Sequence, residues 1–141
     1  MTAYVDTSAL VAYYCPEALS PVVERLVRKL APPTISPLVE VELHSAVALK
    51  VRVREIDTTT AGRIVAQFRM HLADGLYRRV PIAAREYALA CDWLARFATP
   101  LRSLDALHLA AAFANDLQIL TTDKRLVQAA KQLGIGCRLV S

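Results

Sequence analysis

The chain has 141 residues, of which 55% are hydrophobic and 21% are charged. This length suits one domain with a single core, and the hydrophobic content excludes a disordered chain. The apolar runs fall short of the roughly 18–20 residues that a membrane span needs, and the N-terminus lacks the pattern of a signal peptide. We therefore expect a single domain over residues 1–141, with no membrane partner and a cytoplasmic location.

The formal net charge is +4, and arginine outnumbers lysine among the 17 basic residues. Arginine binds phosphate bidentately and stacks on bases, so a basic surface is compatible with a nucleic-acid substrate. Ordinary solvation explains the same charge. The three cysteines, Cys15, Cys91 and Cys137, have no zinc-binding spacing, and we expect them to be reduced.

Strand-like and helix-like segments alternate along the chain, which is typical of a parallel sheet covered by helices. Strands are predicted at residues 3–5, 34–35, 76–80, 118–121 and 136–140. Helices are predicted at about 8–14, 21–30, 37–53, 58–71, 83–97, 104–115 and 124–133. The predicted caps are Ser20, Ser36, Asp57 or Thr58, and Ser103. The pattern predicts an α/β fold.

Four acidic residues occupy positions where a carboxylate is costly. Asp6 and Asp123 each follow a predicted strand, Glu42 lies on the apolar face of its helix, and Asp105 lies on a helix that is otherwise almost wholly apolar. Carboxylates that meet at a buried point repel one another unless a cation joins them. Oxygen ligands without cysteine pairs favour Mg²⁺ or Mn²⁺. The four acids together predict metal-dependent phosphodiester chemistry.

Each acid also has an ordinary explanation when it is taken alone. Asp6 and Asp123 suit helix caps, Asp105 suits the first turn of a helix, and Glu42 needs only a cation or an arginine nearby. A phosphotransferase of the haloacid dehalogenase type would also place an aspartate after its first strand. That chemistry needs a second acid two residues later, where this chain has Ser8. The set of four favours a shared site.

The four acids lie in distinctive segments. These are YVDTSAL at 4–10, SPLVEVEL at 36–43, SLDALHLA at 103–110 and ILTTDKRL at 119–126. In this order and spacing they resemble the PIN-domain ribonucleases, specifically the toxin subunit of VapBC-type toxin–antitoxin modules. The similarity spans essentially the whole chain, whereas residues 55–96 carry no motif of the family and give no information about the substrate.

The resemblance implies a three-layer α/β/α domain with a central, mostly parallel sheet, which usually forms a homodimer. It implies an endonuclease that hydrolyses RNA with Mg²⁺, or with Mn²⁺ in its place. Asp6, Glu42, Asp105 and Asp123 would be both the metal ligands and the catalytic residues. It further implies a cognate antitoxin protein that occupies or distorts the site. The alternatives are a PIN nuclease of RNA maturation outside a toxin module, and a non-catalytic PIN domain that binds RNA or a partner.

Several other residues are candidates for supporting roles. Thr7, Ser8 and Thr121 lie next to the acids and are candidates for orienting the carboxylates or a metal-bound water. Lys124 and Arg125 flank Asp123 and are placed for RNA phosphates. The pattern assigns no role to three further residues, Arg78, Arg79 and His108.

Overall fold

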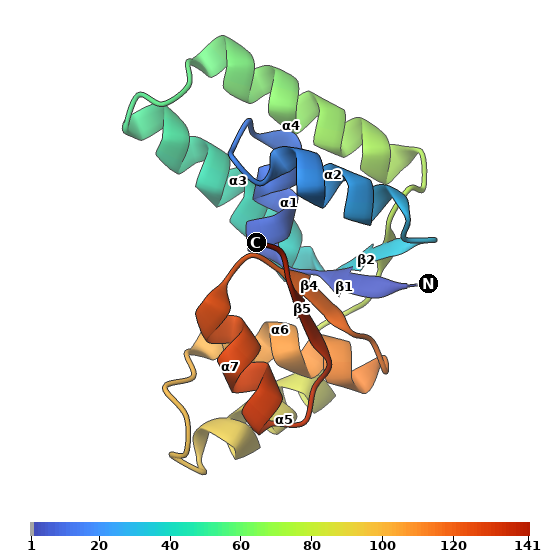
Figure 1. Cartoon of the computed structure of the whole chain (residues 1–141), viewed down its shortest axis with the longest axis vertical. Helices are drawn as coiled ribbons and strands as arrows, with labels where there is room; N and C mark the ends of the chain where they lie inside the picture. Colours follow the sequence, from blue (N-terminus) through green and yellow to red (C-terminus); the bar gives the residue numbers. More distant parts are fainter. Residues whose placement is uncertain (1) are drawn as a thin grey trace.

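A computed structural model describes residues 2–141 of the chain. Within that range, five strands form one sheet in the order β3-β2-β1-β4-β5, and every neighbouring pair is parallel (Figure 1). The strands are β1 (Ala3–Val5), β2 (Pro33–Ile35), β3 (Arg78–Arg79), β4 (Ile119–Thr121) and β5 (Cys137–Leu139). The predicted α/β class with a parallel sheet is confirmed.

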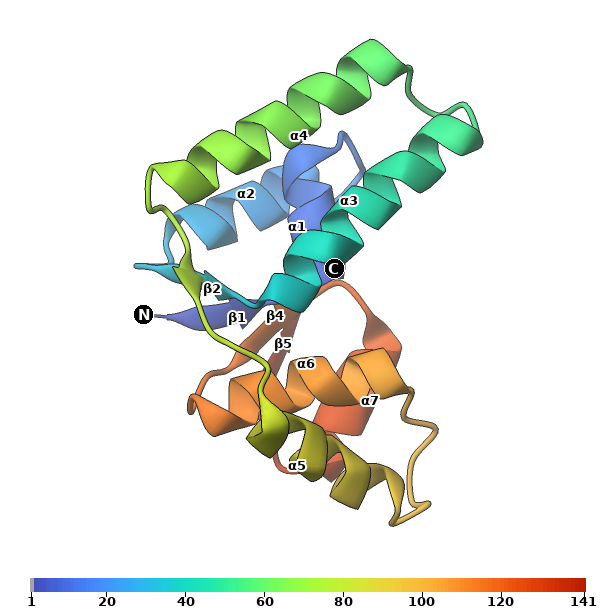
Figure 2. The same ribbon diagram turned by 180° about the vertical axis from the view of Figure 1, so that it is seen from behind.

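Helices cover both faces of this sheet, which gives the predicted three-layer α/β/α arrangement. Within residues 2–141 the helices are α1 (Thr7–Tyr14), α2 (Ser20–Arg28), α3 (Pro37–Arg52), α4 (Thr58–Ala73), α5 (Ala84–Leu94), α6 (Ser103–Ala114) and α7 (Lys124–Gln132). Helices α1 to α4 lie on one side of the sheet and α5 to α7 on the other (Figures 1 and 2). None of these helices is long and apolar enough to cross a lipid bilayer.

The order in which the chain adds strands to the sheet changes sides between β1 and β4, which are parallel neighbours. The early connections lead from β1 outward to β2 and β3, whereas the later ones return to the other side of β1. Right-handed crossovers then place the two sets of helices on opposite faces. Open α/β sheets bind ligands at such a point, outside the carboxyl ends of the strands. Asp6 follows β1 and Asp123 follows β4, so the fold brings both acids to the carboxyl ends of these central strands. This end of the sheet is called the acidic edge below.

Phe68 of α4 joins the outer helices to the core. Its side chain is fully buried, and its ring makes T-shaped contacts with Tyr14, His44 and Tyr77 at centroid distances of 5.4, 6.0 and 5.9 Å. Tyr14 belongs to α1 and His44 to α3. Packing around one ring therefore fixes α3, the helix that carries Glu42, between α1 and α4.

The strand predicted over residues 76–80 is wrong in length, because β3 contains only Arg78–Arg79. The Val80 N–H still donates a hydrogen bond to the Ile35 carbonyl at 2.9 Å. Pro81 comes next and has no N–H to donate, so pairing with β2 ends there.

Two of the predicted helix caps are wrong. Ser20 and Ser103 are the first residues of α2 and α6, not the residues before them. The Ser20 hydroxyl instead donates to the Cys15 carbonyl and accepts the Glu17 N–H, which fixes the preceding turn. The caps predicted at Ser36 and Asp57 are confirmed.

Candidate active site

Asp6 lies at the junction of β1 and α1 and is almost fully buried, with 6% of its surface exposed. Its Oδ2 accepts hydrogen bonds from Ser8 Oγ at 2.7 Å and Thr121 Oγ1 at 2.8 Å. The same oxygen accepts the Ser8 backbone N–H at 3.4 Å, so Asp6 also caps α1. Within residues 2–141 no hydrogen bond reaches Oδ1, which leaves this oxygen available to a cation.

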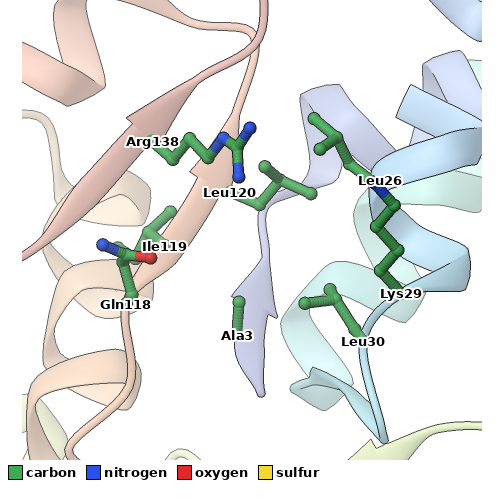
Figure 3. A pocket seen from close by; sticks show the side chains of 8 residues that line it. All are labelled: Ala3, Leu26, Lys29, Leu30, Gln118, Ile119, Leu120 and Arg138. Carbon is green, nitrogen blue, oxygen red and sulfur yellow. The ribbon is translucent and has the colours of Figure 1, made fainter. Parts of the chain in front are cut away.

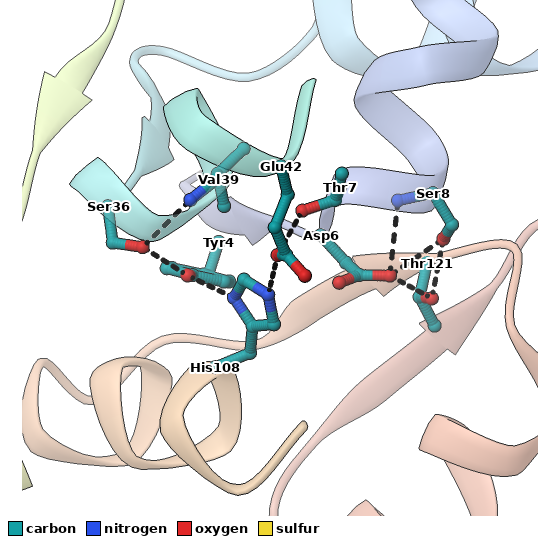
Figure 4. A network of polar contacts seen from close by, with 9 residues as sticks. All are labelled: Tyr4, Asp6, Thr7, Ser8, Ser36, Val39, Glu42, His108 and Thr121. Carbon is teal, nitrogen blue, oxygen red and sulfur yellow. Dashed lines mark hydrogen bonds and ion pairs between the residues drawn. The ribbon is translucent and has the colours of Figure 1, made fainter. Parts of the chain in front are cut away.

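Glu42 lies on α3 and is partly buried, with 25% of its side chain exposed. Its Oε1 accepts hydrogen bonds from Thr7 Oγ1 at 2.7 Å and from His108 Nε2 at closer range. Burial alone would raise the pKa of Glu42, but the hydrogen bonds from His108 and Thr7 help to lower it. Glu42 is therefore held as a carboxylate, and its Oε2 points toward the unbonded oxygen of Asp6 (Figure 4).

A chain of buried hydrogen bonds continues behind Glu42. His108 is 1% exposed, and its Nδ1 lies 2.7 Å from the hydroxyl of Tyr4, which is fully buried in β1. The same hydroxyl lies 2.7 Å from Ser36 Oγ, the cap of α3. Figure 4 shows these side chains in series from α3 through β1 to α6 and back to α3.

Asp105 lies in the first turn of α6, with Arg102 Nε 3.6 Å from its Oδ2. Its pKa is raised, because partial burial and the negative charges of Asp123 and Asp6 outweigh the positive charge of Arg102. Asp105 therefore stands within electrostatic reach of two of the other predicted acids.

Asp123 caps α7, as its position after β4 allows. Its Oδ1 accepts the Arg125 N–H at 2.9 Å, and its own N–H donates to Thr121 Oγ1 at 3.0 Å. The hydroxyl of Thr121 thus links the acid after β1 to the loop after β4. The two basic residues beside it, Lys124 and Arg125, are exposed at the start of α7, where they are accessible to a polyanion.

The four acids differ in how they are brought together. Asp6 and Glu42 face each other through oxygens that accept no hydrogen bond (Figure 4), and Asp105 feels the charges of Asp6 and Asp123. In the part of the chain that the structure describes, no group of three or more His, Cys, Asp or Glu side chains is arranged to hold a metal ion. The convergence of all four carboxylates on one ion therefore stays a prediction.

The donor set nevertheless suits a hard divalent cation. The partners of Asp6 and Glu42 are the hydroxyls of Ser8, Thr121 and Thr7, the Ser8 backbone N–H and the His108 ring. The two oxygens that face each other belong to carboxylates. Mg²⁺ retains several waters and is commonly bound by only one or two protein carboxylates. The pair formed by Asp6 and Glu42 therefore fits Mg²⁺ or Mn²⁺, and Asp105 and Asp123 suit contacts through water.

Two cavities of the molecule differ in whether one of the predicted acids lines them. One cavity of about 130 Å³ lies beside Asp105 and is also lined by Arg102 and Arg125. A second cavity of about 210 Å³ lies between the sheet and α2 (Figure 3). It is lined by Lys29 and Arg138 and by no acidic residue. Of the four predicted acids, Asp105 lines the first cavity, and none of them lines the second.

Sequence reasoning placed Thr7, Ser8 and Thr121 beside the acids, and the structure shows all three donating hydrogen bonds to them. It assigned no part to Tyr4 and left His108 without a role. Two spacings point to them. Tyr4 lies two residues before Asp6 on a strand, and His108 lies one helical turn after Asp105, so each shares a face with an acid.

Comparison with known proteins gives the family and the fold. The chain matches the PIN domain over residues 3–132, and no curated protein matches its sequence. The structure of FitAcB from Neisseria gonorrhoeae is similar, with a TM-score of 0.76 and 17% identity over 97% of this chain and 96% of that chain. VapC20 (Rv2549c) of Mycobacterium tuberculosis, a sarcin-ricin loop cleaving toxin, has a TM-score of 0.70 and 22% identity over 92% and 95%.

A third similar structure is VapBC2 from Rickettsia felis, bound to a DNA fragment from their promoter. It has a TM-score of 0.70 and 14% identity, and the match covers 100% of both chains. At these identities the three structures establish the fold. The PIN domain match covers most of the sequence, including all four acids, the helices α1 to α7 and every strand described above except β5. The chain therefore belongs to the PIN domain family.

Proposed function

We propose that this chain is a ribonuclease that uses Mg²⁺ or Mn²⁺ to hydrolyse RNA phosphodiester bonds, and that it is the toxin of a toxin–antitoxin pair. One observation carries the proposal. At the carboxyl ends of β1 and β4, Asp6 and Glu42 each have one oxygen fixed by two side-chain donors. The other oxygen of each accepts no hydrogen bond from residues 2–141. This arrangement holds two carboxylates ready for a cation instead of pairing them with arginine or lysine.

Neighbouring side chains orient the two carboxylates of the site. Ser8 and Thr121 orient Asp6, while Thr7 and His108 orient Glu42. Asp6 and Glu42 would hold a divalent cation, which would supply an activated water and offset the charge that builds up on the reacting phosphate. Asp105 and Asp123 lie at the same edge and complete the negative field that attracts the cation.

The basic residues beside the acids fit a phosphate backbone. Arg102 and Arg125 line the cavity next to Asp105, and Lys124 is exposed in the first turn of α7. Their charges offset the repulsion between RNA phosphates and the carboxylates. Such contacts position a nucleic acid but carry no sequence information, so they support RNA as the substrate class without naming one RNA.

The toxin role is supported by the similar structures. VapC20 is a toxin that cleaves the sarcin-ricin loop, and another similar structure is a toxin–antitoxin complex from Klebsiella pneumoniae. We propose that this chain likewise binds a small antitoxin protein and forms a homodimer. A lysine or arginine of the antitoxin would relieve the repulsion among the acids in the same way as a metal ion does.

A cleavage assay tests the nuclease activity. Total cellular RNA is incubated with the protein and Mg²⁺ or Mn²⁺, with and without EDTA, and the same is done with Asp6→Asn and with Asp92→Asn. Asp92 is an exposed carboxylate on α5 and serves as the matched control. We expect cleavage by the unaltered protein and by Asp92→Asn, and none by Asp6→Asn or in EDTA. Cleavage that persists in EDTA would overturn the metal-dependent mechanism.

Titration with Mg²⁺ tests the antitoxin mechanism. The binding partner encoded next to this gene is co-purified, and its affinity is measured at rising Mg²⁺ concentrations. We expect the affinity for the antitoxin to fall as the Mg²⁺ concentration rises, because Mg²⁺ and the lysine or arginine of the antitoxin would compete for the same acids. An unchanged affinity would exclude this mode of inhibition while leaving the nuclease standing. Absence of any neighbouring antitoxin gene would favour the alternative of a PIN nuclease in RNA maturation.

A further inference from the structure

The side chains of Ser36, Tyr4, His108 and Glu42 form an unbroken series of hydrogen bonds behind the acidic edge (Figure 4). The first three are at most 1% exposed, although Tyr4 and His108 are 104 positions apart in the sequence. Because buried polar groups are rarely left without partners, each proton in this series has a place that can be deduced.

Ser36 lies at one end of this series. Its Oγ accepts the Val39 N–H at 3.5 Å and otherwise contacts only the Tyr4 hydroxyl among the described side chains. The proton of Ser36 is therefore donated to Tyr4. A phenol, whose ordinary pKa is about 10, keeps its proton at neutral pH. With Ser36 already donating to it, Tyr4 donates that proton to His108 Nδ1.

The other end of the series fixes the second ring nitrogen. The carboxylate of Glu42 only accepts hydrogen bonds, so His108 Nε2 carries the proton that reaches Oε1. His108 is thus the tautomer with hydrogen on Nε2 and a lone pair on Nδ1. Both nitrogens are occupied and the ring is 1% exposed, so His108 touches neither RNA nor water and is not itself a catalytic residue.

We propose that Tyr4 and Ser36 are positioning residues. They set the tautomer of His108 so that its only ring N–H donates a hydrogen bond to Glu42. The Glu42 carboxylate is then held through Oε1 by His108 and Thr7 together, and Oε2 is turned toward Asp6 and the cation. This inference rests on the proposed function, since it assigns the series to metal binding. Loss of such outer partners typically weakens metal affinity or activity 10- to 100-fold.

The Tyr4→Phe variant tests this role, because it removes one hydroxyl and keeps the buried ring. Mn²⁺ affinity is measured by titration calorimetry, and cleavage is measured in parallel. We expect Mn²⁺ binding about 10- to 100-fold weaker than in the unaltered protein, with a fall in kcat and little change in KM. Tyr87→Phe is the control, since Tyr87 is 54% exposed on α5, and we expect it to bind Mn²⁺ normally.

A coupled pair of variants separates positioning from packing. His108→Gln keeps an N–H donor for Glu42 but has no tautomer to set. In the His108→Gln background, Tyr4→Phe should therefore cause no further loss of Mn²⁺ affinity. An equal loss in both backgrounds would mean that Tyr4 acts through packing alone, and it would overturn the proposal.

The tautomer is also measured directly in the unaltered, metal-free protein, by nitrogen NMR of the histidine rings. We expect His108 to show hydrogen on Nε2 and none on Nδ1, and the reverse assignment would overturn the inference even if Tyr4→Phe does not fold. If the unaltered protein binds no Mn²⁺, the proposed function fails together with the positioning role. If it binds Mn²⁺ and Tyr4→Phe binds equally well, only the positioning role fails.

Discussion

At the scale of single residues, the structure of the acidic edge follows from which oxygen of each carboxylate is already in use. Asp6 and Glu42 each have two side-chain donors on one oxygen. Those donors lower the energy of the charged form, but they do not cancel the repulsion between two carboxylates that face each other. We therefore expect the metal-free site to be under electrostatic strain.

This strain gives a prediction for stability without metal. In EDTA, Asp6→Asn should keep or raise the melting temperature, because one of the repelling charges is gone while an acceptor oxygen remains. Thermal unfolding followed by circular dichroism measures the effect. A fall of several degrees would show instead that Asp6 matters mainly as the cap of α1, since loss of a good cap costs about 1 kcal/mol.

Lys124 gives a prediction for RNA binding. Its replacement by alanine should weaken binding to RNA of any sequence and reduce the slope of log affinity against log salt by about 1, the value for a single phosphate contact. Filter binding over a series of salt concentrations gives this slope. Lys131→Ala, at the exposed far end of α7, is the control that should leave the slope unchanged. Equal effects of both variants would mean that Lys124 only adds to the general positive charge.

The sequence predicts which acids belong to the edge but not how they are held. Asp6 and Asp123 follow strands, and that position is enough to bring them to one end of a parallel sheet. The partnership of Tyr4 with His108 joins residues 104 positions apart, and no local pattern encodes which nitrogen meets which oxygen. Only the packing of α6 against the sheet determines that.

At the scale of the elements, caps illustrate both the strength and the limit of local reasoning. Asp57 caps α4 by accepting the Thr60 N–H at 2.7 Å, and this hydrogen bond lowers the pKa of Asp57. Ser103 has the same kind of side chain as other caps but begins α6 itself, because the backbone of Arg102 already has the extended conformation of a cap. The helix predicted over 83–97 ends at Leu94, and Phe97 beyond it has a left-handed φ of 52°.

The cap of α4 gives a prediction for pH dependence. A carboxylate whose pKa is lowered on folding stabilises the fold above its unfolded pKa, and this stability is lost as pH falls through the folded pKa. Asp57→Ala should therefore lower the melting temperature at pH 7, and the difference from the unaltered protein should shrink at about pH 2.5, below the unfolded value of about 3.9.

Asp57→Asn is the matched variant for that experiment. It retains an acceptor for the Thr60 N–H but has no charge to titrate, so its melting temperature should exceed that of Asp57→Ala at both pH values. If the deficit of Asp57→Ala is the same at pH 7 and at about pH 2.5, the carboxylate charge plays no part in capping α4.

At the scale of the whole molecule, α3 and its C-terminal cap residue carry large apolar side chains that are exposed. Val41, Leu49 and Val53 are 67, 50 and 55% exposed. The proposed homodimer would cover these side chains with a second copy of the chain.

Leu49→Glu tests this surface. A charge in an apolar interface is costly, so we expect the unaltered protein to sediment as a dimer at micromolar concentration and Leu49→Glu to sediment as a monomer. Tyr87→Glu, which changes an exposed aromatic residue on the other side of the sheet, should remain dimeric. A monomeric unaltered protein would rule out the homodimer, and a dimeric Leu49→Glu would place the interface elsewhere.

The residues of the acidic edge come from both helix layers. Glu42 belongs to the layer of α1 to α4, whereas His108 and Asp105 belong to the layer of α5 to α7 (Figure 1). The hydrogen bond between Glu42 and His108 crosses from one layer to the other. Hydrogen bonds tolerate changes of only a few tenths of an ångström. A partner that shifts one helix layer relative to the other would therefore break this hydrogen bond and inactivate the site without placing any group in it. A covalent link between α3 and α6 would make the protein resistant to such a partner.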